Sequence, residues 1–294
     1  MGASSSREIW VHGARPRTLP AAIAPVLVGT GAAVGAGSSQ VIWANALLAL
    51  VVSLALQVGV NYANDYSDGI RGTDSSRVGP MRLVGSGAVP ARQVRMAAFI
   101  SFAVACVAGL LIAATTSWWL LLVGAICIAA AWGYTGGPKP YGYLGLGELF
   151  VFIFFGVVAT TGTTYAITRQ VTLLSLICSI AVGALACALL VVNNLRDIPG
   201  DTQSGKITLA VKLGDRTTRG LYVALIWLAA LAIGVVAFKR LPAITGLVGL
   251  IAVLPAIREI RRGASGKQLI PVLGATGRAQ LIVAILLTAG LIIG

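Results

Sequence analysis

Charged residues are scarce in this chain of 294 residues, where Asp, Glu, Lys and Arg together make up only 11%. A soluble domain carries about 25% charged residues, because its surface faces water. Apolar and aromatic residues supply 57% of the chain instead, and the mean hydropathy is +0.90. The shortage of charge excludes a soluble globule. It predicts an integral membrane protein of the all-α class, because the apolar runs have the length of membrane-spanning helices.

Histidine and cysteine are also few, with one His and four Cys in the whole chain. The cysteines lie inside apolar stretches without metal-ligand spacing, so we interpret Cys106, Cys127, Cys178 and Cys187 as small packing residues. His12 precedes the first apolar run and is interpreted as a surface residue, with contact to a bound substrate as the alternative. Because residues 1–17 contain no apolar core, no cleavable signal peptide is expected.

Acidic residues are outnumbered, with 9 Asp and Glu against 22 Lys and Arg. A nucleic-acid-binding domain concentrates its basic residues on one soluble face. Here the basic residues lie in short gaps between apolar runs. The excess of positive charge therefore indicates membrane topology, and no nucleic-acid partner is expected.

Nine apolar runs predict nine transmembrane helices in a single membrane domain over residues 1–294. Several approach the 20 or so residues that cross a hydrocarbon core. The predicted spans cover roughly residues 18–36, 41–62, 94–115, 117–134, 147–168, 172–194, 220–238, 241–257 and 279–294.

The basic residues also predict the orientation of these spans. With a cytoplasmic N-terminus, 19 of the 22 Lys and Arg residues fall on the cytoplasmic side, and only Arg169, Lys239 and Arg240 fall outside. This asymmetry follows the positive-inside rule. The predicted cytoplasmic loops are 63–93, 135–146, 195–219 and 258–278. The two longest lie on this face, so we expect the active site there.

Two acidic clusters stand at the predicted cytoplasmic ends of the second and sixth spans. The first contains Asn64, Asp65, Asp68 and Asp74, and the second contains Asn193, Asp197 and Asp201. A four-residue spacing lines side chains along one helical face, although Pro199 favours an end of the second helix there. Taken singly, such Asp residues are common helix caps and turn formers. Two matched clusters instead indicate a shared site.

Oxygen ligands without His or thiolate favour Mg²⁺, which takes one or two carboxylates together with phosphate oxygens and water. Carboxylates, Mg²⁺ and nearby basic residues are typical of a diphosphate site. Acidic residues in a membrane protein also mark ion paths, so a cation transporter is the alternative. The middle parts of the predicted spans carry no such groups, which favours the diphosphate interpretation.

Four motifs resemble the UbiA superfamily of intramembrane aromatic prenyltransferases, and within it the 1,4-dihydroxy-2-naphthoate polyprenyltransferases of menaquinone synthesis. The motifs occupy residues 15–20, 64–74, 134–139 together with 145–148, and 197–208. The resemblance implies nine helices and a multi-pass protein of the bacterial inner membrane. It also implies a reaction in which a polyprenyl diphosphate ionises with Mg²⁺ and its carbon is attacked by the naphthoate ring. Loss of the carboxylate then gives a demethylmenaquinone.

The same resemblance implies roles for individual residues. The metal-binding set is Asn64, Asp68, Asp74, Asp197 and Asp201, and the catalytic set is Asp65, Asp68, Asp197, Asp201 and Lys139. The diphosphate ligands implied are Arg82, Lys139 and Lys206, for which topological anchoring is the alternative. Gly72 stands where much of the superfamily has a further Asp, and Asp74 is the substitute.

Several features leave alternatives open. Phe150, Phe152, Phe154 and Phe155 are expected mostly to pack or face lipid, with one of them available to shield a carbocation. Trp118 and Trp119 are assigned to the outer interface. Another aromatic acceptor, such as 4-hydroxybenzoate or homogentisate, is the closest alternative activity. The prenyl chain length, the oligomeric state and the group that deprotonates the acceptor stay open.

Overall fold

The computed structural model describes residues 6–37, 41–73 and 81–294, and within these ranges every regular element is a helix. The α-helices are α1 (Ser6–Ala14), α2 (Pro20–Gly35), α3 (Trp43–Arg71), α4 (Ala91–Thr115), α5 (Leu120–Gly133), α6 (Gly147–Val151), α7 (Ala159–Thr168), α8 (Leu173–Gln203), α9 (Leu209–Lys239), α10 (Thr245–Gly249), α11 (Leu254–Arg261) and α12 (Leu269–Ile293). The short elements are η1 (Pro16–Thr18), η2 (Tyr141–Leu144), η3 (Phe152–Val158), η4 (Leu241–Ile244), η5 (Leu250–Val253) and η6 (Gly266–Gln268).

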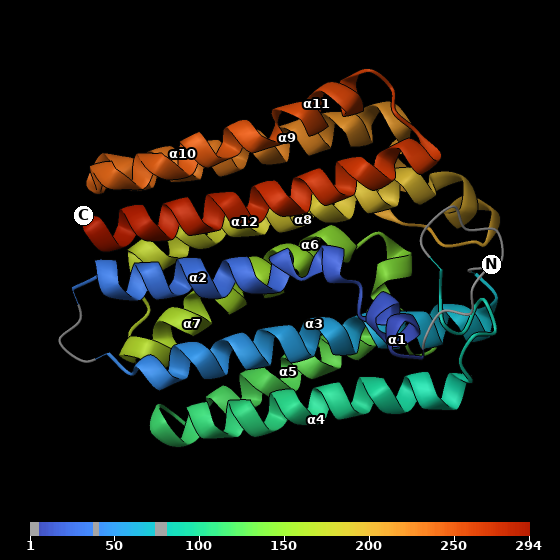
Figure 1. Cartoon of the computed structure of the whole chain (residues 1–294), viewed down its shortest axis with the longest axis horizontal. Coiled ribbons are helices and arrows are strands. Elements are labelled where there is room, and N and C mark those ends of the chain that lie inside the picture. Colours follow the sequence, from blue (N-terminus) through green and yellow to red (C-terminus); the bar gives the residue numbers. More distant parts are fainter. Residues whose placement is uncertain (1–5, 38–40, 74–80) are drawn as a thin grey trace.

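The long helices run side by side along the molecule (Figure 1). Helix α8 packs against α9, α3 against α4, and α12 against α2. Along α8 most positions are small or aliphatic, and Cys178, Ala184 and Val191 are fully buried. A helix that is apolar on all sides belongs in the interior. Helix α8 therefore forms the centre of the largest core, with α2, α9 and α12 around it.

Among the residues that the structure describes, seven helices are long and apolar enough to cross a membrane, or eight if the bent pair formed by residues 7–18 and 20–35 counts as one span. The protein is thus a multi-pass membrane protein. Helix α5, with 14 residues, is apolar but shorter than these helices. All nine predicted runs coincide with helical segments, while the number that spans the bilayer stays a prediction.

One predicted loop, 195–219, is largely helical, and the first part of another, 63–93, continues the preceding helix. Helix α3 continues to Arg71 and α8 to Gln203, and α9 begins at Leu209, with a break at Gly214. The expected helix end at Pro199 was wrong. Near the end of a helix a proline forfeits few backbone hydrogen bonds, and Pro199 is exposed. Both acidic clusters therefore lie on helices, where the backbone fixes their spacing.

One helical segment between residues 147 and 168 contains the π-helical stretch η3. A Cβ atom at Gly156 in this stretch would lie 2.6 Å from the Cα atom of Gly183 on α8. Only glycine allows the two backbones to approach so closely. The wider π-helical turn, often found at functional sites, lies beside the cavity described below.

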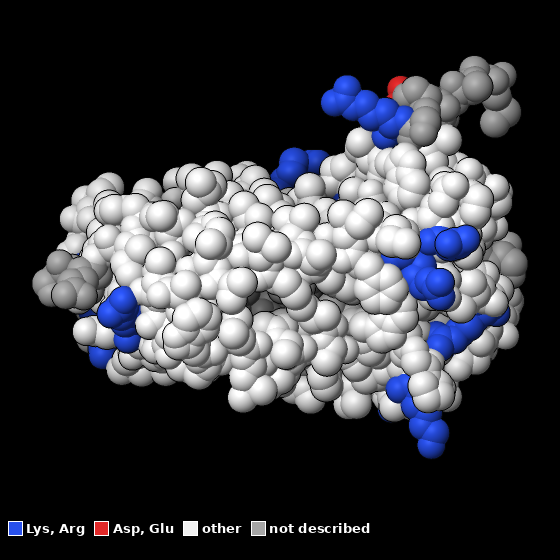
Figure 2. All heavy atoms as spheres, turned by 90° about the horizontal axis from the view of Figure 1, so that it is seen from below, with Lys and Arg blue, Asp and Glu red and all other residues white. Residues whose placement is uncertain are grey.

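On the face that Figure 2 shows, most Lys and Arg side chains lie toward the two ends of the molecule, and the surface between them carries little charge. More of them lie at the end that holds α1 and the C-terminal parts of α3 and α8. The surface between the ends on this face has the apolar character that contact with lipid requires. The end with more basic residues also carries both acidic clusters.

Candidate active site

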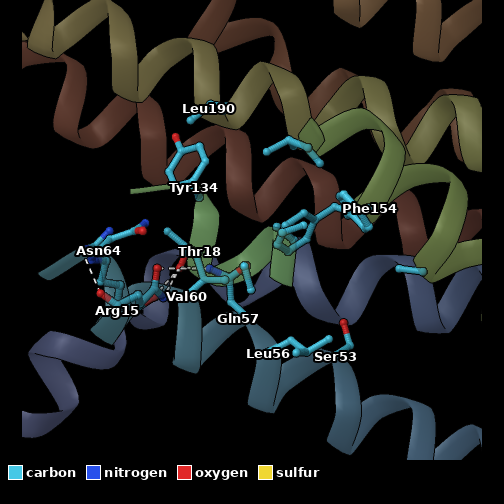
Figure 3. A pocket seen from close by; sticks show the side chains of 18 of the residues that line it. Arg15, Thr18, Ser53, Leu56, Gln57, Val60, Asn64, Tyr134, Phe154 and Leu190 are labelled. Carbon is cyan, nitrogen blue, oxygen red and sulfur yellow. Dashed lines mark hydrogen bonds between the residues drawn. The ribbon is translucent and has the colours of Figure 1, made fainter. Parts of the chain in front are cut away.

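One large cavity, of about 600 Å³, opens between α2, α3, α5, η3 and α7. Its wall includes Asp68 at one end and Ala49 at the other, both on α3. Nineteen residues separate them, which is about 28 Å along a helix. Asn64, Arg15 and Thr18 lie toward one end, and Phe154, Leu56 and Ser53 toward the other (Figure 3). The cavity thus joins a polar mouth to a long apolar interior.

Below the mouth, polar side chains continue along the same face of α3. Gln57 donates to the Asn61 side chain at 3.2 Å, and Asn61 donates to Thr18 Oγ1 at 3.1 Å. The Arg15 guanidinium donates to the Asn61 carbonyl at 3.3 Å. These bonds join the N-terminal segment to α3. They give the upper part of the cavity neutral hydrogen-bonding groups beside its charged mouth.

Asp68 lies at this mouth and is 2% exposed. The Tyr143 hydroxyl donates to its Oδ1 atom at 2.7 Å, and Lys206 Nζ lies 3.8 Å from its Oδ2 atom. Lys206 Nζ and the Arg71 guanidinium lie 5.1 and 5.3 Å from the centre of the Tyr143 ring. Burial and the Asp68 charge raise the pKa of Tyr143 to about 12. Lys206 follows the second cluster, so this contact brings the two motifs together.

A glycine turn directs Lys206 back to α3. After α8 ends, the Lys206 backbone N–H donates to the Asp201 carbonyl at 2.8 Å, and Gly205 has a φ of 73°. A positive φ is favourable for glycine and costly for other residues. This reversal is a common way to end a helix. Its position in the chain explains why Lys206 reaches Asp68.

The first motif is also tied to the turn that follows α5. The Thr135 hydroxyl donates to the Asn64 side chain at 2.7 Å, and the Arg71 guanidinium donates to the carbonyls of Thr135 and Gly137. Lys139 lies in this turn, but its side chain is exposed and is not part of the cavity wall. The structure therefore brings Asn64 to the cavity and leaves Lys139 outside it.

The second motif is arranged around Arg196, which is buried and lines the cavity. Its guanidinium donates to both oxygens of Asp197 at 2.7 Å and to the Asn193 side chain at 2.8 Å. Bidentate pairs of this kind fix geometry as well as charge. Asp201 follows one turn later and is half-buried. The Asp68, Asp201 and Glu148 carboxylates all lie close enough to the Tyr134 hydroxyl to act on it electrostatically.

Comparisons with known proteins agree with this geometry. The model of the UbiA prenyltransferase family matches residues 22–269. The chain belongs to the UbiA prenyltransferase family. It is 53% identical to the 1,4-dihydroxy-2-naphthoate octaprenyltransferase of Mycobacterium tuberculosis over 97% of both chains. It is 32% identical to the Escherichia coli protein of that name over 98% of this chain and 96% of the relative.

Solved structures share the fold of this UbiA prenyltransferase. A UbiA homolog from Aeropyrum pernix K1 matches with a TM-score of 0.70 at 17% identity, over 93% of this chain and 97% of that one. A homolog from Archaeoglobus fulgidus bound to GPP and Mg²⁺ matches with a TM-score of 0.64 at 16% identity, over 94% and 99%. The expected family and all-helical fold are confirmed.

The donor set of this prenyltransferase fits Mg²⁺ only together with a ligand that supplies further oxygens. Among the described residues, no three His, Cys, Asp or Glu side chains gather closely enough to hold a metal ion. Asp68 lines the cavity, and both Asp68 and Asp201 lie near enough to Tyr134 to act on it electrostatically. Since Mg²⁺ commonly uses one or two carboxylates with phosphate oxygens and water, the arrangement suits a metal that arrives with a diphosphate.

The other predicted residues have varied surroundings. Arg82 lines the cavity and is 9% exposed. Asp65 does not line the cavity; its carboxylate accepts hydrogen bonds from the backbone N–H groups of Leu83 and Val84. Asp74 lies outside the described residues. Phe150, Phe154 and Phe155 line the cavity, so more of the aromatic run borders the candidate site than the sequence indicated.

Several site residues were missed at the level of sequence. Arg196 is adjacent to Asp197, and Gln57 and Asn61 continue the spacing of Asn64 and Asp68, so these three had a usable signal. Tyr143 had none, because it reaches Asp68 only through the fold of the turn after α5. His12 is exposed, as expected, and lies at the cavity mouth.

Proposed function

We propose that this enzyme transfers a polyprenyl group from an allylic polyprenyl diphosphate to 1,4-dihydroxy-2-naphthoate, with loss of the carboxyl group as CO₂, giving demethylmenaquinol, the hydroquinone form of demethylmenaquinone. The names of the relatives at 53% and 32% identity support this acceptor. The observation that carries the proposal is the contact of Lys206 with Asp68 at the mouth of the long apolar cavity. That arrangement offers charge to a diphosphate and apolar space to its hydrocarbon tail.

The bond changes define what the site must do. The bond between the allylic carbon and the diphosphate oxygen breaks, and a bond forms from that carbon to the ring carbon that loses CO₂. Bound Mg²⁺ supplies charge neutralisation for the departing diphosphate. Asp68, Asp197, Asp201 and Asn64 would hold it, while the position of Asp74 in the chain makes it a further candidate.

Basic side chains would bind the diphosphate directly. Arg82 and Lys206 line the cavity and carry charge to its mouth. Fixed positive groups aimed at developing negative charge stabilise a transition state strongly in a site that excludes water. Lys139, which is exposed, would contribute by moving its long side chain toward the mouth.

The apolar part of the cavity would orient the tail of the donor. Phe150, Phe154 and Phe155 border it below the mouth. Aromatic faces stabilise nearby positive charge by cation–π attraction, so these rings suit the carbon that loses the diphosphate. A tail bound along the cavity also excludes water from that carbon, which protects it from hydrolysis.

For the topology we propose nine spans, with the N-terminus and the active site on the cytoplasmic side of the bacterial inner membrane. The short helix α5 would be the additional span. The asymmetry of basic residues between the two ends of the molecule supports this orientation.

The test of the activity is a panel of acceptors offered to the purified enzyme with one polyprenyl diphosphate and Mg²⁺. We expect diphosphate release and prenylated product with 1,4-dihydroxy-2-naphthoate, and little with 4-hydroxybenzoate or homogentisate. Equal or greater turnover with another acceptor would overturn the acceptor assignment. Cation flux in proteoliposomes without any prenyl transfer would instead support the transporter.

A further inference from the structure

Asp65 lies between two cavity residues, Asn64 and Asp68, but its carboxylate serves a different purpose. It is 0% exposed. Its Oδ2 atom accepts the backbone N–H of Leu83 at 2.9 Å, and its Oδ1 atom accepts the backbone N–H of Val84 at 2.9 Å. A buried carboxylate that accepts two backbone N–H groups is a strong anchor, since each bond is charge-assisted.

The segment that Asp65 holds is a compact turn of residues 82–89, here called the Arg82 turn. Within it the Ser86 N–H donates to the Arg82 carbonyl at 3.0 Å, and the Gly87 N–H donates to the Val84 carbonyl at 2.9 Å. The Val89 N–H closes the turn on the Leu83 carbonyl at 3.1 Å. The turn therefore has its own backbone bonds, and Asp65 fixes it to α3.

Packing wedges the same turn between α1 and α3. Leu83 is 0% exposed, and a Cβ atom added at Gly13 of α1 would lie 2.5 Å from its Cδ1 atom. A Cβ atom at Gly69 of α3 would lie 2.5 Å from the Val84 side chain. Both glycines are thus needed for close approach. The residues on either side of these contacts have little freedom to shift.

Arg82 is the residue next to this anchor and is part of the cavity wall. A mostly buried guanidinium is useful to a ligand only if its position is fixed, because displacement by about 1 Å is costly in a preorganised site. The bonds from Asp65 restrain the peptide groups that directly follow Arg82.

We infer that Asp65 is a positioning residue that fixes Arg82 toward the diphosphate and is not itself a metal ligand; this inference rests on the proposed function of Arg82. Asparagine cannot replace it, because a side-chain amide has one acceptor oxygen and would present an N–H group to a backbone N–H. Asp65→Asn should therefore loosen the Arg82 turn without altering the cavity charges at Asp68 or Lys206.

The experiment is a double-mutant cycle with Asp65→Asn, Arg82→Ala and the double variant, each measured for KM toward polyprenyl diphosphate and for the Mg²⁺ concentration at half-maximal rate. We expect Asp65→Asn to raise the donor KM about 10-fold and to leave the Mg²⁺ requirement unchanged. The double variant should be no worse than Arg82→Ala, since coupled residues give non-additive effects. Multiplied effects, or a raised Mg²⁺ requirement like that expected for the control Asp68→Asn, would overturn the inference.

Hydrogen exchange gives a readout that does not depend on activity. The Leu83 and Val84 amides should be protected in the native enzyme and lose protection in Asp65→Asn, while the amide of Lys206 in the other basic turn stays unchanged. Unaltered exchange at Leu83 and Val84 would contradict the anchoring. If Arg82→Ala alone leaves the donor KM unchanged, the role of Arg82 in the proposed function fails, whereas the exchange result still decides whether Asp65 holds the turn.

A second variant covers the case in which Asp65→Asn does not fold. Leu83→Ala loosens the same turn from the opposite side and leaves the Asp65 carboxylate intact. It should reproduce the rise in donor KM with an unchanged Mg²⁺ requirement. A donor KM equal to that of the native enzyme would show that fixing the turn does not matter to the donor, and the inference would fall.

Discussion

Tyr143→Phe is the sharpest test of the site, because it removes one oxygen atom and keeps the ring. The lost hydroxyl donates to Asp68 at 2.7 Å, whereas the ring that faces Lys206 and Arg71 remains. A hydrogen bond to a charged group contributes about 1.5–3 kcal/mol. At about 1.4 kcal/mol for each factor of ten, we expect kcat/KM for the prenyl diphosphate to fall roughly 10- to 150-fold.

The pH dependence separates this positioning role from proton transfer. Because the pKa of Tyr143 is raised to about 12, its phenol keeps its proton and donates to Asp68 throughout the working range, which lies well below that value. A group that removes a proton from the acceptor must instead be deprotonated in the working range. We therefore expect the rate profiles of the native enzyme and Tyr143→Phe to have the same shape between about pH 7 and pH 10.

The assay is steady-state kinetics of both substrates in detergent, with thermal unfolding measured on the same samples. Tyr141→Phe is the matched control, since its hydroxyl donates to the neutral Ala130 carbonyl at 2.8 Å. Removing that hydroxyl should lower the free energy of unfolding by only about 0.5–1.5 kcal/mol and should affect kcat/KM less. The reasoning is refuted if Tyr143→Phe retains native kcat/KM, or if both variants lose the same activity.

Four other predictions concern the metal site, Arg82, Lys139 and the membrane topology. Asp68→Asn and Asp197→Asn should each lower turnover by orders of magnitude in a protein that still folds and inserts, measured as diphosphate release; near-normal turnover of either would remove it from the metal site. Arg82→Ala should raise the KM for the prenyl diphosphate roughly 10- to 100-fold, as expected for one charge-assisted contact, and leave the acceptor KM unchanged. Lys139→Ala should also raise the KM for the prenyl diphosphate in the same assay; an unchanged KM would identify Lys139 as an exposed topological charge instead. In a variant without the native cysteines, cysteine at exposed Ser204 should react with thiol reagents from the cytoplasm and cysteine at exposed Gln170 only from outside; labelling of Ser204→Cys from outside contradicts the topology.

The positions of the helices were predictable because lipid leaves a strong pattern in the sequence. Runs of apolar residues have few alternatives to a helix in a membrane, where every backbone group needs a partner inside the segment. The ends of the helices were not predictable in this way. Residues 63–71 and 195–203 are polar enough to look like loops, yet both continue the preceding helix into the mouth of the cavity.

The site residues likewise include some that the sequence predicts and some that it does not. Spacing along a helix identified Asn64, Asp68, Asp197 and Asp201, because neighbours on one face are fixed by the helical repeat. The hydrogen bonds that Asp65 accepts and the hydrogen bond from Tyr143 to Asp68 involve turns that are distant from α3 in the sequence. Such contacts are tertiary, and no local pattern in residues 64–68 or 141–144 reports them.

The carboxylates Asp68, Asp197 and Asp201 and the basic residues Arg82 and Lys206 are carried by different kinds of backbone, whereas Arg196, another basic residue of the cavity wall, lies on α8. Asp68, Asp197 and Asp201 lie on α3 and α8, whereas Arg82 and Lys206 lie on turns. Hydrogen bonds hold each of these turns to a helix that carries carboxylates. The Arg82 turn is held to α3 by Asp65, and the turn of Lys206 is held to α8 by the Asp201 carbonyl.

This fastening has a consequence for how the mouth can bind a diphosphate. Arg82 and Lys206 are held by the same helices that carry the carboxylates. The distance between each basic residue and the carboxylates of its helix is therefore fixed by the fold. The contact of Lys206 with Asp68 then joins the motifs to each other. A site preorganised in this way needs little rearrangement when negative charge develops on a leaving group, and this is the condition under which electrostatic stabilisation is largest.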